Sequence, residues 1–208
     1  FKLVAVLFFG IGIFLFISTS FVIVGSDEVG HLKKIYLGRE MKPGQVIAFD
    51  GENGPQARIL TPGFHFSPFL RVIYKVEFFP VLEIPGGFCG KVVASDGVSL
   101  RNGQVFADEW SEAKFNDMLN AEYFLKNGGQ KGPQLSVLKP GKYRLNHYLF
   151  TVDSKTPVKD IPAGYVGVVK SNVQQVKEDP NAVESVVTGL NLKAEVVPVG
   201  FKGVWKKV

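Results

Sequence analysis

The chain has 208 residues, a formal net charge of +5 and a single cysteine. Its basic residues are scattered, with no run longer than the pairs Lys33-Lys34 and Lys206-Lys207, so we expect no nucleic-acid partner. The single cysteine, Cys89, excludes an internal disulfide framework, and its apolar neighbours favour a small buried side chain over a nucleophile.

The N-terminal segment from Leu3 to Val24 carries no charge and is mostly Leu, Val, Ile and Phe. As a helix it would span roughly 33 Å at about 1.5 Å per residue, which exceeds a hydrocarbon core of about 30 Å. The run is longer than the apolar part of a cleavable signal peptide. It therefore predicts a single-pass membrane protein, in a bacterial inner membrane or an equivalent one, with its orientation left open.

Short strands and turns are expected over the rest of the chain, because strings rich in Val, Ile, Phe and Tyr alternate with Gly and Pro. The strand-like strings cover residues 29–36, 45–49, 72–78, 90–94, 104–107, 166–170 and 192–197. Two helices interrupt them. One is predicted from Glu112 to Lys126 with Ser111 as its cap, and a shorter one opens at Asp179-Pro180.

The chain also repeats itself. Ile84-Pro85-Gly86-Gly87 returns as Ile161-Pro162-Ala163-Gly164, and the string that contains Pro62-Gly63 returns around Pro140-Gly141 at nearly the same spacing. A shorter third echo begins at Val197-Pro198. Agreement between two independent offsets indicates that one structural unit was duplicated.

These repeats define the predicted domains. Residues 1–24 form the transmembrane helix, 25–83 module one, 84–160 module two with a helical insertion near 112–126, and 161–208 an incomplete module three. The predicted fold class is α+β and mostly β: one N-terminal transmembrane helix followed by tandem β-rich modules with short inserted helices. Because module three stops before its own Pro-Gly turn, we expect the natural protein to be longer.

Candidate catalytic groups are sparse. His31, His65 and His147 have no metal-ligand spacing with the cysteine, and the acidic residues are scattered. Ser111 and Lys114 fit a Ser-x-x-Lys pattern that can activate a serine, but its companion motifs are absent. We therefore expect no catalysis, no metal and no cofactor.

Four strings in module one carry a family resemblance. They are Asp27-Glu28-Val29-Gly30, Leu37-Gly38-Arg39, Pro62-Gly63-Phe64-His65-Phe66-Ser67-Pro68 and Val72-Ile73-Tyr74-Lys75-Val76. In this order, just after an apolar segment, they resemble the start of the SPFH, or band 7, domain of stomatin, prohibitin and flotillin relatives. The resemblance covers residues 1–83 well and 84–208 only through the repeats. The long helical second half of that family does not occur in this sequence.

The resemblance implies a non-enzymatic membrane scaffold. Such a scaffold assembles into a large homo- or hetero-oligomeric ring or cage, organises a membrane microdomain, and can enclose a membrane protease or another membrane protein. Phe64, Phe66 and Phe69 are candidates for contact with the membrane interface, although Phe64 and Phe66 suit the core of module one equally well.

Two other functions stay open. One is a membrane-tethered module that binds a peptide or glycan at a concave aromatic site. The other is a hydrolase that uses Ser111 with Lys114.

Overall fold

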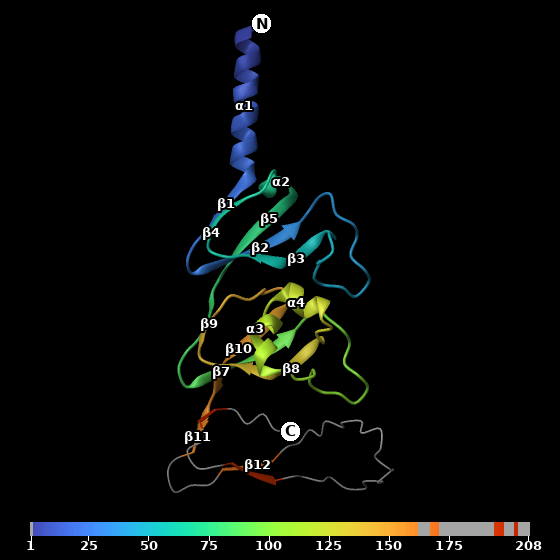
Figure 1. Ribbon diagram of the computed structural model, residues 1–208, viewed down its shortest axis with the longest axis vertical. Coiled ribbons are helices and arrows are strands. Elements are labelled where there is room, and N and C mark those ends of the chain that lie inside the picture. Colours follow the sequence, from blue (N-terminus) through green and yellow to red (C-terminus); the bar gives the residue numbers. More distant parts are fainter. Residues whose placement is uncertain (1, 162–166, 171–193, 198–201, 204–208) are drawn as a thin grey trace.

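The computed structural model describes residues 2–161, 167–170, 194–197 and 202–203, and it is mostly β (Figure 1). Helix α1 (Lys2–Ser20) extends from one end of the molecule, and two β-rich modules follow it along the same long axis. The short helix predicted after Asp179 lies outside the described residues.

The prediction of a transmembrane helix from Leu3 to Val24 is wrong. Helix α1 ends at Ser20, and β1 (Phe21–Val24) follows it directly, paired antiparallel with β4 (Gly63–Phe66). The 19 residues of α1 correspond to about 28 Å, which is short of a hydrocarbon core of about 30 Å. Within the described part of the chain, no helix has both the length and the hydropathy needed to cross a membrane. The β-branched side chains at 22–24 explain the change to strand, because they suit a pleated sheet.

Module one, from β1 to β5, combines a three-stranded and a two-stranded antiparallel sheet. The larger sheet has the order β3-β2-β5, and the smaller one is the β1-β4 pair. A short helix, α2 (Leu70–Ile73), leads into β5. The strands of the larger sheet are β2 (Glu28–Lys34), β3 (Gly54–Leu60) and β5 (Tyr74–Pro80).

Module two, from β6 to β10, has the same topology. Its larger sheet has the order β10-β7-β8, and its smaller one is the β6-β9 pair, so that β6 to β10 correspond one by one to β1 to β5. The turns at Pro62-Gly63 and Pro140-Gly141 accordingly occupy equivalent places before β4 and β9. The strands are β6 (Leu82–Ile84), β7 (Phe88–Ala94), β8 (Gly132–Leu138), β9 (Gly141–Tyr143) and β10 (Phe150–Pro157).

Four short strands described after module two pair in the same manner. Strand β11 (Lys159–Asp160) pairs with β14 (Lys202–Gly203), and β12 (Gly167–Lys170) pairs with β13 (Ala194–Val197). These pairs correspond to β6-β9 and β7-β8 of module two.

Two of the strand-like strings do not form strands. Residues 45–49 and 104–107 lie in loops and contribute isolated bridges, from Ala48 to Gln56 and from Ala107 to Gln134. The two bridges are again equivalent, so the loops of the repeat follow the same path as well as its strands.

The inserted helix of module two is broken into three pieces: η1 (Glu112–Lys114), α3 (Phe115–Met118) and α4 (Ala121–Lys126). Asn120 caps α4, since its Oδ1 accepts hydrogen bonds from the second and third residues of that helix at 3.0 and 3.2 Å. Met118 and Phe124 are fully buried in the core of module two. The insertion is therefore part of the core, whereas the repeat alignment placed it outside the structure common to both modules.

The larger hydrophobic core crosses the boundary between the modules. Ile47 and Ala57 of module one are buried together with Leu138, Leu149 and Phe150 of module two. A second, smaller core, made of Val22, Val24, Leu32, Leu60 and Leu70, lies within module one. The junction is thus a packed interior and not a linker.

A glycine at the centre of each module lets the small sheet cross the large one. A Cβ added at Gly90 would lie 2.6 Å from Ile84 Cδ1 and 3.2 Å from Leu138 Cβ. A Cβ at the equivalent Gly30 would lie 3.1 Å from Leu60 Cβ. Contacts this short with neighbouring side chains leave no room for a methyl group.

We predict that Gly90→Ala lowers the free energy of unfolding by about 1–3 kcal/mol, because the methyl group overpacks this crossing. Denaturant unfolding of the full chain in mild detergent, followed by circular dichroism, measures the effect. Gly86→Ala is the control, since a Cβ there meets no atom within 4 Å. Equal losses in the two variants would contradict the packing argument.

Candidate functional site

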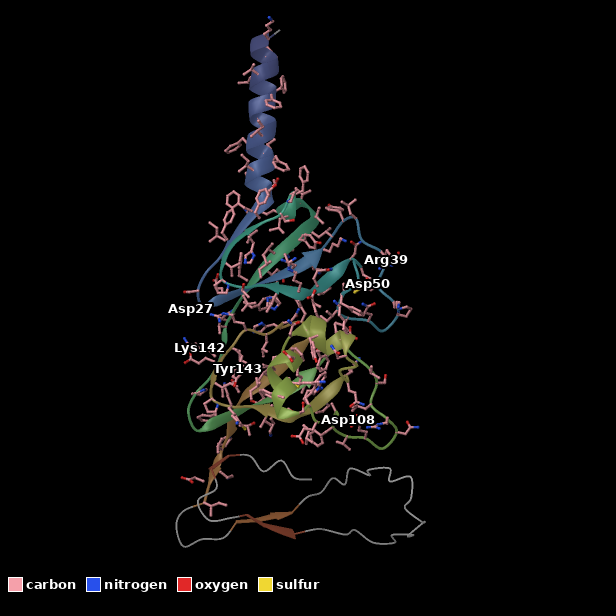
Figure 2. All side chains as sticks on the ribbon, viewed as in Figure 1. Asp27, Arg39, Asp50, Asp108, Lys142 and Tyr143 are labelled. Carbon is pink, nitrogen blue, oxygen red and sulfur yellow. The ribbon has the colours of Figure 1, made fainter. Side chains whose placement is uncertain are left out.

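The N-terminal end of the molecule is apolar on every side. Phenylalanine side chains of α1 remain largely exposed, including Phe8, Phe9 and Phe14 at 69–71%. Figure 2 shows side chains projecting from α1 in all directions. A helix that is hydrophobic all round needs an apolar environment, which the described residues do not themselves provide.

A rigid joint ties α1 to module one without a linker. Ser20 is fully buried; its Oγ accepts a hydrogen bond from Phe69 N at 3.1 Å, and its carbonyl oxygen accepts one from Ser67 N at 2.8 Å. The rings of Phe16 and Phe69 meet edge to face with centroids 5.1 Å apart. These contacts fix the direction of α1 relative to the sheet.

The three sequence-predicted interface residues surround this joint. Phe64 and Phe66 lie on β4 with exposed fractions of 65% and 58%, and Phe69 precedes α2 with 48%. None belongs to either hydrophobic core. Ile23 of β1, which is 66% exposed, lies directly across from Phe64. We call these four residues the apolar collar; its contact with a membrane interface remains a prediction.

The second group of interest joins the two modules, and no pattern in the sequence predicted it. Asp96 follows β7 and is buried. Its Oδ2 accepts hydrogen bonds from Val46 N and Ile47 N of module one, both at 2.7 Å. Asn146 reaches across in the other direction, donating from Nδ2 to the carbonyl oxygens of Gln56 and Ala57 at 2.8 and 2.9 Å.

A histidine pair lies at the same junction. His31 of β2 is fully buried, and its Nε2 accepts a hydrogen bond from His147 N at 2.8 Å. Its Nδ1 faces Val29 O at 3.3 Å, which fits a neutral ring protonated at Nδ1. Phe79 stacks on His147 with centroids 5.2 Å apart, and Tyr148 also meets the His31 ring. The two histidines are too far apart in sequence for spacing to have predicted the contact.

Burial sets the protonation of this cluster. Desolvation lowers the pKa of His31 from 6.5 to about 4 and also lowers the pKa of His147. Lys75, whose Nζ lies 2.8 Å from Glu77 Oε1, lowers the pKa of Glu77 together with the Tyr148 hydroxyl. Burial and the hydrogen bond to Glu77 raise the pKa of Tyr148. At neutral pH the cluster therefore contains neutral rings and one paired carboxylate.

The other residues that the sequence analysis considered for catalysis or metal binding do not come together in one site. Cys89 is buried in β7, and the Nε2 of His65 lies 2.6 Å from Thr61 O. Ser111 O accepts a hydrogen bond from Lys114 N at 2.9 Å, so this pair closes the first turn of the inserted segment. Over the described ranges, no group of three or more His, Cys, Asp and Glu side chains is placed to hold a metal ion.

Comparisons of the chain with protein-family models, with curated proteins and with solved structures found no match.

We predict that acid weakens the junction through His31. Its folded pKa of about 4 lies below the 6.5 of an unfolded histidine, so this contribution to stability is complete above pH 6.5 and is lost as the pH falls toward 4. The loss amounts to at most about 3 kcal/mol. His31→Gln, which keeps an acceptor but cannot titrate, should flatten this part of the curve of unfolding free energy against pH. Equal slopes for wild type and His31→Gln would contradict the prediction.

Proposed function

We propose that this protein is a membrane-bound scaffold of the SPFH, or band 7, type, whose repeated β modules assemble laterally into a ring or cage. The assembly would organise a patch of membrane, in a bacterial inner membrane or an equivalent one, and could enclose a membrane protease or another membrane protein. The observation that carries the proposal is the repetition of one sheet topology along an axis that starts at an apolar end.

The apolar end supports the lipid part of the proposal. Helix α1 and the apolar collar together expose large hydrophobic side chains at one end of the molecule, next to the Ser20 joint that connects them. Large exposed apolar surfaces mark sites of interaction with a partner or a membrane.

The open sheet edges support lateral assembly. Among the described strands, β5 and β10 each pair on one side, with β2 and β7 respectively. Because the two strands are equivalent, the molecule presents the same edge at two successive heights. An unpaired edge is a template for another chain unless it is protected. Several weak contacts that close into a ring act together, so each layer can be small.

The alternative of a tethered binding module predicts a concave aromatic site. A cleft of about 490 Å³ lies between the 42–52 loop of module one and the 96–99 turn of module two. Its lining is mostly polar, with Phe49 as the aromatic contribution from the described residues. This lining favours the scaffold over recognition of a glycan by aromatic stacking.

Particle size tests the scaffold directly. We expect the full-length protein, extracted in mild detergent or in native lipid discs, to run as a large oligomer. A monomer under all of these conditions would refute the scaffold and leave the tethered binding module as the better account.

A pair of edge substitutions tests the geometry. Phe78 on β5 is 46% exposed and Thr151 on β10 is exposed, so Phe78→Lys with Thr151→Lys places a charge on each open edge without touching the core. We expect the particles to fall to small species with unchanged circular dichroism. Val98→Lys, an exposed position outside the strands, is the control and should leave particle size unchanged.

A further inference from the structure

A turn of module one exposes three consecutive apolar side chains. Ile35, Tyr36 and Leu37 follow β2 and have exposed fractions of 46%, 60% and 84%. We call them the 35–37 turn. The sequence analysis included Ile35 and Tyr36 in a predicted strand, yet β2 ends at Lys34.

Leu37 adopts a conformation that leucine disfavours. Its φ is 64°, and Phe69 is the other non-glycine residue with positive φ in the described part of the chain. The left-handed region suits Gly, which lacks the Cβ that crowds the following carbonyl oxygen, and to a lesser extent Asn or Asp, whose short polar side chains can hydrogen-bond locally. Asn53 holds the turn in place, with N donating to Arg39 O at 2.8 Å and Nδ2 to Gly38 O at 3.1 Å. Backbone strain that the surroundings maintain is a mark of function.

Module two contains a turn that is equivalent to the 35–37 turn. Ser95, Asp96 and Gly97 follow β7 as Ile35, Tyr36 and Leu37 follow β2. Ile35 N donates to Ile73 O, just before β5, at 2.9 Å, and Ser95 N donates to Leu149 O, just before β10, at 2.8 Å. The two turns are therefore equivalent in the fold.

The side chains of the two equivalent turns differ because the turns face different surroundings. In module two the turn is polar, has glycine at the left-handed position, and docks through Asp96 onto module one. Because the modules follow one another along one axis, the same turn of module one faces away from module two, toward the end that carries α1 (Figure 1). There leucine replaces glycine, and the polar docking residue is replaced by tyrosine.

We infer that the 35–37 turn is a second lipid contact, which inserts Tyr36 and Leu37 into the headgroup region of an anionic bilayer. This inference rests on the proposed membrane-bound scaffold and adds a contact that the apolar collar does not supply. The Ile35–Ile73 hydrogen bond places the turn beside α2, and Phe69 at the start of α2 packs on Phe16 of α1. The turn therefore lies beside the short helix whose first neighbour, Phe69, packs on α1.

The flanking charges fit an anionic lipid surface. Arg71 is exposed on the adjacent α2, whereas Lys34, which precedes the turn, donates from Nζ to Gly51 O at 3.2 Å. Tyrosine suits the boundary between headgroups and acyl chains, since its ring is apolar and its hydroxyl is polar. In Figure 1, β1 and β4 lie to one side of α2 and the chain after β2 to the other, so collar and turn would support module one on two sides.

Depth-dependent quenching tests the contact. In a Cys89→Ser background, the full chain is labelled with an environment-sensitive dye at Leu37→Cys, Phe64→Cys or Val98→Cys and bound to phosphatidylcholine–phosphatidylglycerol vesicles containing a spin-labelled lipid. Val98, 55% exposed directly after the equivalent turn of module two, is the matched control. We expect quenching and a blue shift of emission at 37 and 64, and neither at 98.

The other outcomes each overturn the inference in a recognisable manner. Quenching at 64 without quenching at 37 leaves the lipid-bound scaffold standing and refutes the second contact. Loss of quenching at both positions refutes the lipid-bound scaffold as well. A blue shift at 37 without quenching means that protein, such as a second copy of the chain, covers the turn.

A second variant separates the lipid contact from a structural role. Asparagine tolerates the left-handed region, so Leu37→Asn should keep or raise the unfolding midpoint. With the dye attached at Tyr36→Cys, Leu37→Asn should lower the quenching toward that measured for the dye at Val98→Cys. Unchanged quenching at 36 would refute an insertion driven by Leu37.

Discussion

The buried junction between the two modules is the constraint on which the rest of the structure depends. Ile47 of module one has no exposed surface and packs in a core built mostly by module two, while Asp96 satisfies its backbone N–H. An unpaired amide at such a site would cost about 1–3 kcal/mol. Burial of Ile47 is therefore favourable only because Asp96 accepts the hydrogen bond from its backbone N–H. The Ser20 joint is equally buried, so packed contacts and not linkers connect α1 to module one and module one to module two.

The two modules have diverged where their surroundings differ. Gly30 and Gly90 serve the same crossing of small sheet over large sheet in both copies. The next position along the strand is the buried His31 in module one and the exposed Lys91 in module two. His31 faces the neighbouring module, and a charged side chain there would be desolvated without a partner. The two copies therefore share a backbone path, whereas the side chains at equivalent positions differ according to what each copy packs against.

The sequence was informative where the signal is local or repeated. The Pro-Gly turns and the strand-like strings predict three strands of the two modules, β2, β5 and β7, because turn chemistry and β-propensity act over a few residues. Strands β3, β8 and β10 were not among the predicted strings. The end of α1 was not predicted, because the apolar run resumes at Phe21 after Ser18-Thr19-Ser20, and an apolar run alone does not distinguish a helix from a strand. The break before Asn120 was missed because an apolar stripe at helical spacing continued through it. The contacts of Asp96, Asn146 and His31 were beyond prediction, since each joins residues far apart in the chain.

The mixed chemistry of the junction determines how it responds to acid. Asn146 is an amide and does not titrate, and the burial of the Ile47 side chain does not depend on protonation, so neither of these two contributions changes as the pH falls toward 4. Protonated His31 would instead direct an N–H at the N–H of His147, replacing an attraction with a repulsion on one side of the junction. The modules would then hinge about the contacts that persist, because those contacts lie beside the histidines and stay intact. Since α1 is fixed to module one through Ser20, any such rotation would change the angle between module two and the apolar end of the molecule.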